Sequence, residues 1–182
     1  MTGPRKIKFL DPAEIEEAIG EIAALAHSHD ADVALVGGAA MAAYGSDRLT
    51  RDVDFASDLI IPGLPVLRKL PFGGIATKIS GDVPVDLIVR DDEYADLYAE
   101  ALHHTVDVGL PVKVVTAEYL AALKMAAGRS KDEADLETLV ALGAADLPKT
   151  RKIVKTHLGE YAARSLDHLV EEIAWKRSKE GQ

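Results

Sequence analysis

The chain of 182 residues has a formal net charge of −9, and 48% of its residues are hydrophobic. This length and composition suit one compact domain, or one domain with a helical extension, and not two full domains. The absence of cysteine excludes a disulfide framework, a thiolate zinc site and a cysteine nucleophile. The acidic balance argues against a broad phosphate-binding surface such as nucleic-acid binders present. No apolar run approaches the roughly 20 residues that span a bilayer, and no signal peptide is recognisable, so we expect a cytoplasmic protein.

The first part of the chain predicts a helix, a strand, a short helix and a second strand. Residues 12–29 have apolar side chains at spacings of three and four, which is typical of an amphipathic helix. The apolar run DVALVGG, residues 32–38, predicts a strand that ends in glycines, and the alanine-rich segment 39–45 predicts a short helix. The segment RDVDFA, residues 51–56, alternates acidic and apolar residues, as a strand with one buried face does.

The middle of the chain predicts an irregular segment, two strands joined by a turn, a helix and two short strands. Residues 57–74 are rich in proline and glycine, and we expect one turn of helix around Val66 to Leu70. IATKIS and VPVDLIV predict strands joined by a turn at Gly81–Asp82. A helical period follows over residues 92–104, and TVDVG and PVKVV are short strand candidates.

From Thr116 onward the pattern is almost entirely helical. Strands that alternate with helices and are followed by a helical tail predict an α+β fold, in which a mixed β-sheet is flanked by helices. We therefore expect a core over residues 1–115 and a helical C-terminal region over residues 116–182 that packs on this core.

Two aspartates of the second predicted strand point to the same side. Successive side chains of a strand project from opposite faces, so Asp52 and Asp54 share one face while Val53 and Phe55 enter the core. Carboxylates about 6 to 7 Å apart along a strand repel unless a cation lies between them, and hard oxygen ligands suit Mg²⁺ or Mn²⁺. In PVDLIV, Asp86 is a third carboxylate between apolar neighbours. If the two strands are neighbours, the three acids form one metal-binding cluster.

A glycine pair precedes these acids. Gly37 and Gly38 have no side chains, so a phosphate can approach the backbone, and the helix that follows offers unpaired N–H groups and its positive dipole end. A nucleoside triphosphate can then bind at the glycine pair while metal held by Asp52 and Asp54 bridges its oxygens. These features predict a site for phosphoryl or nucleotidyl transfer.

Other interpretations of the same residues explain less. An EF-hand calcium loop needs a ligand where Ala56 stands, a glycine in place of Ser57 and a glutamate in place of Gly63. A dinucleotide-binding fingerprint needs G-x-G-x-x-G, which GGAAMA does not match. A glycine turn beside solvated acids would explain a lone D-x-D, but three acids after a glycine pair are a more specific pattern.

These motifs resemble a known family. The glycine pair, the DVDF that follows thirteen residues later and the VDL around Asp86 resemble the polymerase-beta-like nucleotidyltransferase superfamily. The stretch GGAAMAAYGSDRLTRDVDF more closely resembles its AbiEii-type toxin group, whose pattern R-x-S/T-x-D-x-D is matched by Arg48, Thr50 and the two aspartates. In LKMAAGRSKDEAD, a helix with a lysine and a K/R-D-x-x-D segment also resemble that group. The resemblance covers roughly residues 33–140.

The resemblance implies a metal-dependent nucleotidyltransferase, which moves a nucleoside monophosphate from an NTP to an acceptor and releases pyrophosphate. It implies that Asp52, Asp54 and Asp86 are catalytic and bind Mg²⁺ or Mn²⁺, with Asp86 as a base or a further ligand. It also implies that the catalytic Lys124 contacts the nucleotide phosphates. The nucleotide-binding residues that it implies are Gly37, Gly38, Arg48, Thr50, Lys124, Asp132 and Asp135.

The resemblance further implies a toxin–antitoxin setting, in which the acceptor is tRNA or a partner protein and a cognate toxin or antitoxin is the partner. The acidic charge of the chain also leaves a cationic acceptor such as an aminoglycoside open. A non-catalytic nucleotide-binding or protein-interaction module of the same fold is the alternative from another class.

Helix-end electrostatics offer a second interpretation of two of these residues. Gly128 can end one helix, and Ser130 with Glu133 predicts a capping box at the start of the next. Lys124 in a last turn and Asp132 in a first turn each complement a helix dipole, which contributes about 0.3 to 1 kcal/mol to stability. Both interpretations stay open at the level of sequence.

Overall fold

The computed structural model describes residues 8–180, so the N-terminal residues that bear on a signal peptide lie mostly outside it. The first helix, α1, spans Pro12–Ser28, as the amphipathic pattern predicts. A capping box starts it, because the Asp11 carboxylate accepts from the backbone N–H of Glu14 while the Glu14 carboxylate accepts from that of Asp11. Its apolar side, including the fully buried Ile19 and Ile22, faces the sheet.

One mixed sheet of seven strands forms the centre of the molecule, in the order β3-β4-β5-β2-β1-β7-β6. Parallel pairs join β2 to β5 and β1 to β7, and the other neighbours are antiparallel. The predicted α+β class is therefore confirmed. The strands are β1 (Val33–Val36), β2 (Val53–Ser57), β3 (Arg68–Lys69), β4 (Ile75–Ile79), β5 (Val83–Ile88), β6 (Thr105–Val106) and β7 (Val114–Val115).

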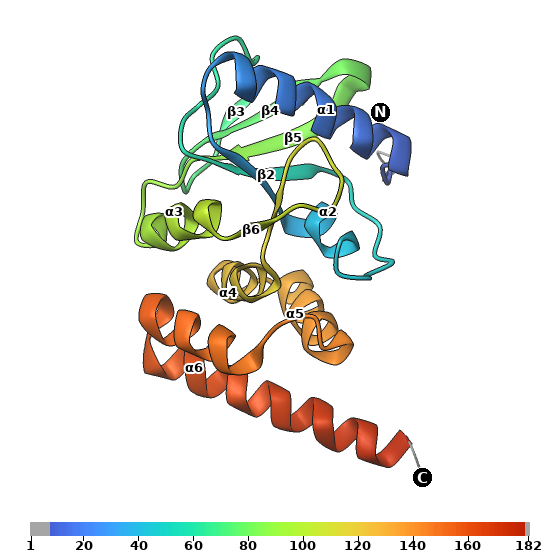
Figure 1. Ribbon diagram of the computed structural model, residues 1–182, viewed down its shortest axis with the longest axis vertical. Coiled ribbons are helices and arrows are strands. Elements are labelled where there is room, and N and C mark those ends of the chain that lie inside the picture. The colour runs from blue at the N-terminus through green and yellow to red at the C-terminus, as the bar shows by residue number, and fades with distance from the viewer. Residues whose placement is uncertain (1–7, 181–182) are drawn as a thin grey trace, which may run out of the picture.

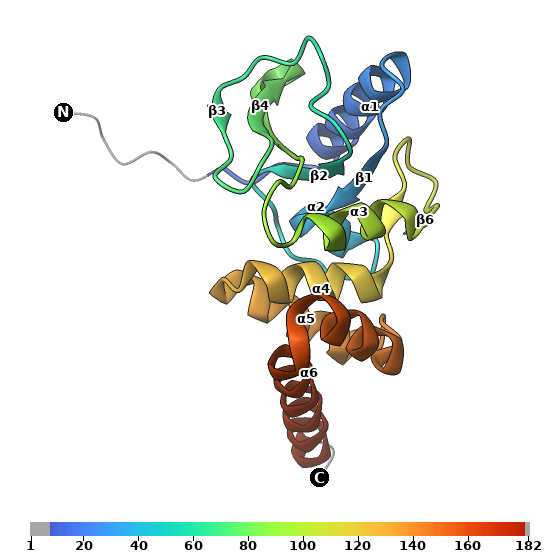
Figure 2. The same ribbon diagram turned by 90° about the vertical axis from the view of Figure 1, so that its left-hand side faces the viewer.

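Helices cover both faces of this sheet (Figures 1 and 2). Helix α1 lies on one face and contacts β2 and β5. On the other face lie α2 (Gly37–Ala42), which directly follows β1, and α3 (Ala95–His103). A short 3-10 helix, η1 (Ser80–Asp82), forms the predicted turn between β4 and β5.

The C-terminal part is helical from Ala117 onward. Helices α4 (Ala117–Ala127) and α5 (Ser130–Leu142) lie below α2 and α3 in Figure 1, and α6 (Leu147–Glu180) packs on α4 and α5. Gly159 interrupts α6 with φ +87° and ψ 174°, so α6 consists of two helices that meet at a kink. The division into units at residue 115 stays a prediction.

Two local predictions are wrong. No turn of helix forms around Val66–Leu70, because the edge of β4 recruits this segment as the two-residue strand β3. The backbone N–H groups of Leu67 and Leu70 donate to the carbonyls of Ala76 and Gly74, 3.0 Å away in both cases. The Ser130 capping box is also absent: Ser130 already lies inside α5, and the residue at the N-cap is Arg129.

Within residues 8–180, no helix is both long enough and apolar enough to cross a membrane.

Candidate active site

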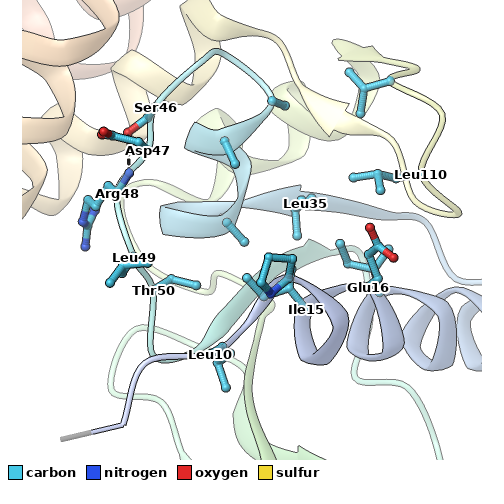
Figure 3. A pocket seen from close by; sticks show the side chains of 16 residues that line it. Leu10, Ile15, Glu16, Leu35, Ser46, Asp47, Arg48, Leu49, Thr50 and Leu110 are labelled. Carbon is cyan, nitrogen blue, oxygen red and sulfur yellow. Dashed lines mark hydrogen bonds between the residues drawn. The ribbon is translucent and has the colours of Figure 1, made fainter.

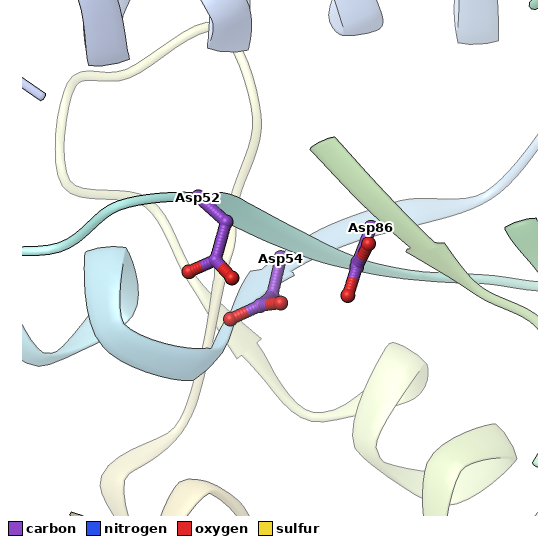
Figure 4. A group of neighbouring side chains, drawn as sticks. All are labelled: Asp52, Asp54 and Asp86. Carbon is purple, nitrogen blue, oxygen red and sulfur yellow. The ribbon is translucent and has the colours of Figure 1, made fainter. Parts of the chain in front are cut away.

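Three carboxylates meet where β2 and β5 run side by side. The two strands are parallel, and their register places Asp54 opposite Asp86, while Asp52 directly precedes β2. One oxygen from each carboxylate lies within 4.8 Å of the others. Figure 4 shows all three side chains on the same side of the sheet. The structure thus brings together the three acids that the strand pattern predicted, while Val53 and Phe55 are fully buried on the opposite face.

The three acids lie close enough to repel one another. Within residues 8–180, none of them forms a salt bridge, although Thr50 Oγ1 donates to Asp52 Oδ1 across 3.4 Å. Burial, followed by the charges of Asp52 and Asp86, raises the pKa of Asp54 to about 7. Burial and the charge of Asp52 also raise the pKa of Asp86, against the opposing charge of Arg68.

This donor set fits a divalent cation. Opposite oxygen ligands of one Mg²⁺ lie about 4 Å apart, so small rotations are enough to bring oxygens spread over 4.8 Å onto one ion. Hard carboxylate oxygens are the ligands that Mg²⁺ and Mn²⁺ prefer. The residues that would hold such an ion are Asp52, Asp54 and Asp86.

The two glycines have different surroundings. Gly37 has φ +65°, and a Cβ added to it would lie 1.9 Å from Asp54 Oδ2. Only glycine therefore allows the Asp54 carboxylate to pack directly against the backbone at this position. Gly38 faces Thr50 instead, and a Cβ there would lie 2.9 Å from Thr50 Oγ1. The space beside the Cα of Gly38 is therefore filled by protein, while Gly37 adjoins the acids. The predicted nucleotide-binding role of both glycines stays a prediction.

The other predicted residues form an ion-pair network. Lys124 is buried in α4, and its ammonium donates to Asp132 at 3.3 Å and to Asp135 at 2.5 Å, both of which are buried in α5. Arg48, from the loop before β2, also pairs with Asp135. Arg129 pairs with Asp132 at 2.5 Å. Burial tends to raise the pKa of Asp132, but the hydrogen bond from Arg129 and the charge of Lys124 outweigh it and lower that pKa.

A small cavity connects this network to the acid cluster. It has a volume of about 40 Å³, and Gly37, Asp54, Lys124, Arg129 and Asp132 all line it. The motif around residues 37–54 and the motif around residues 124–135 therefore meet in space. The cavity has the size of one or two water molecules, so a nucleotide would have to lie outside it, over the exposed side of the acids.

Sequence reasoning missed three residues at this place. Arg129 and the exposed Lys131 both stand close enough to the cluster to oppose the raised pKa of Asp86. A cation three residues before Asp132 at a helix start is a local signal that could have identified Arg129. Tyr98, which lines the same cavity from α3, has a pKa raised by burial to about 12. No local pattern marks Tyr98, because only the packing of α3 places it there.

A separate apolar cavity of about 520 Å³ lies between α1, α2 and the loop at residues 46–50 (Figure 3). Leu10, Ile15 and Leu35 contribute to its apolar wall, and the acidic residues Glu16 and Asp47 also line it. None of the three clustered acids lines it. This cavity is therefore not the metal site, even though Arg48 and Thr50 border it.

Two solved structures are similar to this chain. An antigenic nucleotidyltransferase-like protein from Paracoccidioides brasiliensis has a TM-score of 0.53 and 18% identity, over 90% of this chain and 95% of its own. The antibiotic-resistance factor ANT(2'')-Ia has a TM-score of 0.57 and 18% identity, over 87% of this chain and 98% of its own. No protein-family model matches the chain, and no curated protein matches it significantly. The chain therefore has the nucleotidyltransferase fold. The comparisons do not test its resemblance to the AbiEii-type group, which stays a prediction.

The raised pKa of Asp54 predicts how the stability of the metal-free protein depends on pH. An acid whose pKa rises on folding favours the protonated folded state, so the free energy of unfolding falls as pH rises from about 4 to about 7. In the Asp54→Asn variant, this fall in the free energy of unfolding should be smaller by about 2 to 4 kcal/mol, since one pKa unit corresponds to about 1.4 kcal/mol. Urea unfolding in EDTA at pH 5 and pH 8 measures it, with the exposed Glu17→Gln in α1 as the control. An Asp54→Asn variant that keeps the wild-type pH dependence would contradict the prediction.

The contact of Gly37 with Asp54 predicts an effect on metal binding. Gly37→Ala should weaken Mn²⁺ binding about tenfold or more, because the added Cβ displaces a ligand carboxylate and φ +65° disfavours alanine. Gly20→Ala in α1, where a Cβ meets no atom within 4 Å, is the matched control and should leave Mn²⁺ binding unchanged. Mn²⁺ titration followed by electron paramagnetic resonance measures both. Equal affinity in the two variants would show that Gly37 does not position Asp54.

The buried pairs of Lys124 predict a larger stability effect than a helix dipole would give. Lys124→Ala should lower the free energy of unfolding by about 3 kcal/mol, because it removes a cation from two buried carboxylates. The exposed Lys131→Ala on the following helix should change it by no more than about 0.5 kcal/mol. Denaturant unfolding of both variants tests this. A loss below about 1 kcal/mol would favour the helix-dipole interpretation.

Proposed function

We propose that this protein is a metal-dependent nucleotidyltransferase. The observation that carries the proposal is the cluster of Asp52, Asp54 and Asp86, three half-buried carboxylates within 4.8 Å that form no salt bridge within residues 8–180. A cluster of this kind is unfavourable unless a metal binds it. The nucleotidyltransferase fold of the two similar structures supports the same reaction class.

The reaction requires an attack on the α-phosphorus of an NTP. A hydroxyl of the acceptor forms the new P–O bond, the bond to the β-phosphate oxygen breaks, and pyrophosphate leaves with the electron pair. Asp86 takes the hydroxyl proton, a role that suits a carboxylate whose pKa is raised by burial. Asp52 and Asp54 would hold the Mg²⁺ or Mn²⁺, which when bound neutralises charge on the phosphate oxygens.

The cations near Gly37 suit the leaving phosphates. Lys124 and Arg129 line the same small cavity as Gly37 and Asp54, and Lys131 is exposed nearby. Two of the three ammonium donors of Lys124 are already engaged by Asp132 and Asp135, which leaves one for a phosphate oxygen. Asp132 and Asp135 are buried and paired with cations. These two acids therefore position Lys124 and Arg129 and do not contact the nucleotide themselves.

The toxin–antitoxin setting, with tRNA or a partner protein as acceptor, rests on the resemblance of residues 33–140 to the AbiEii-type group. One similar structure is by its title an antibiotic-resistance factor, and the net charge of −9 would suit a cationic acceptor. A non-catalytic module of the same fold is the rival from another class. It predicts that no acceptor becomes labelled.

Removal of either metal ligand tests the proposal. Asp52→Asn and Asp54→Asn should each lower Mg²⁺-dependent transfer from α-³²P-NTPs about 10²-fold or more, as loss of a preorganised electrostatic contact does. The label is followed into the protein itself, bulk tRNA and a cell lysate. Glu17→Gln, on the helix that covers the other face of the sheet, should behave as wild type. Wild-type binding of a non-hydrolysable NTP with Mg²⁺ in both aspartate variants, together with unchanged transfer, would refute the site.

A further inference from the structure

A row of paired residues crosses the sheet from its edge to the acid cluster. Arg68 in β3 pairs with Ala76 in β4, Ala76 pairs with Asp86 in β5, and Asp86 pairs with Asp54 in β2. Residues that are directly opposite in a sheet project from the same face. The side chain of Arg68 therefore belongs to the face that carries the acid cluster.

Nothing large separates Arg68 from Asp86. Neighbouring strands lie about 4.8 Å apart, so two strand spacings put the Cα atoms of Arg68 and Asp86 about 10 Å apart. Between them, Ala76 contributes only a methyl group and is half-buried. Arg68 itself is exposed, and within residues 8–180 its side chain takes part in no hydrogen bond or salt bridge. Its charge nevertheless acts on Asp86 and tends to lower the pKa of that carboxyl, against the rise that burial causes.

The strand order places Arg68 and Gly37 on opposite sides of the acid cluster. Beyond Asp54, in the direction of β1, lies Gly37, which lines the small cavity together with Lys124 and Arg129. Beyond Asp86, in the direction of β4 and β3, lies Arg68. In an in-line displacement the attacking and leaving oxygens stand on opposite sides of the phosphorus. With the leaving pyrophosphate on the Gly37 side, the acceptor enters on the Arg68 side.

We propose that Arg68 determines acceptor specificity by binding an anionic group, a phosphate or a carboxylate, next to the attacking hydroxyl. The proposal rests on the nucleotidyltransferase function proposed above and adds the class of acceptor to it. A guanidinium presents a planar fork of donors that matches a phosphate or a carboxylate in a bidentate way. The same charge repels a cationic group at this position. The face beside Asp86 therefore suits an anionic acceptor although the whole chain is acidic.

A charged residue on an edge strand can also serve to prevent edge-to-edge association of sheets. Lys69 provides the control for that role. It is the next residue of β3, is exposed, and pairs with Ile75, so it lies on the opposite face of the same strand. Lys69→Gln removes one positive charge from the same edge without changing the face that carries the acids.

The test measures binding in two steps by isothermal titration calorimetry. The first step binds a non-hydrolysable NTP with Mg²⁺ to wild type, Arg68→Gln and Lys69→Gln, and all three should bind it equally. The second step titrates four matched compounds that share a vicinal diol into each complex: glycerol 3-phosphate, glycerate, glycerol and 3-amino-1,2-propanediol. Wild type and Lys69→Gln should bind an anionic diol about 10- to 100-fold more tightly than glycerol, as a charge-assisted hydrogen bond predicts. Arg68→Gln should lose this preference.

The two steps separate the two ideas. Failure of wild type to bind the NTP with Mg²⁺ would refute the proposed function itself. Normal NTP binding followed by no preference for an anionic diol, by no binding of any diol, or by equal loss in Lys69→Gln would overturn the role of Arg68. Weaker NTP binding in Arg68→Gln alone would also overturn it, because Arg68 would then serve the nucleotide. A preference for glycerol 3-phosphate over glycerate identifies the group as a phosphate, and the reverse identifies a carboxylate.

Discussion

The parallel pairing of β2 with β5 places Asp54 beside Asp86, and the mutual repulsion of the acids gathered there shapes the whole site. Val53 and Phe55 of β2 and Val85 and Leu87 of β5 are buried on the α1 side, so the carboxylates between them project from the opposite face. Repulsion and burial together raise the pKa values of Asp54 and Asp86. This repulsion is the physical basis of the metal site proposed above.

The structure contains a second acid cluster with the opposite electrostatic character. Asp132 and Asp135 are more deeply buried than the first three acids, yet each is paired with cations, and the pKa of Asp132 is lowered. Burial alone does not decide the pKa of Asp132, since the hydrogen bond from Arg129 and the charge of Lys124 outweigh it. One cluster is thus complete within the chain and links α4, α5 and the loop before β2. The acids of the other cluster form no salt bridge within residues 8–180.

The helical C-terminal part is tied to the sheet by polar contacts as well as by apolar packing. Glu100 in α3 accepts a hydrogen bond from the Tyr119 hydroxyl of α4 and lies 3.0 Å from the His157 ring of α6. Together with the Lys124 network, this contact holds α4 against the core from two sides. The position of Lys124 near Asp54 therefore depends on helices that are distant in sequence from the strands.

Much of the candidate site follows from local patterns. Alternation in RDVDFA and VPVDLIV assigns Asp52, Asp54 and Asp86 to exposed strand faces, because side chains of a strand alternate whatever the strand pairs with. The glycine pair and the helical period around Lys124 are visible in the same way. Such patterns reveal the face on which a residue lies but not the partner that it meets there.

The partners were decided by the tertiary structure. Register between β2 and β5 and the salt bridge from Arg48 to Asp135 across 87 positions depend on segments far apart in the chain. The recruitment of Arg68 into an edge strand depends on β4, which follows it closely in the chain. The capping box predicted at Ser130 is absent because α5 already includes Ser130 and has Arg129 at its N-cap. Pairing energies between distant segments depend on which groups the folded backbone brings together, and local periodicity carries no information about that.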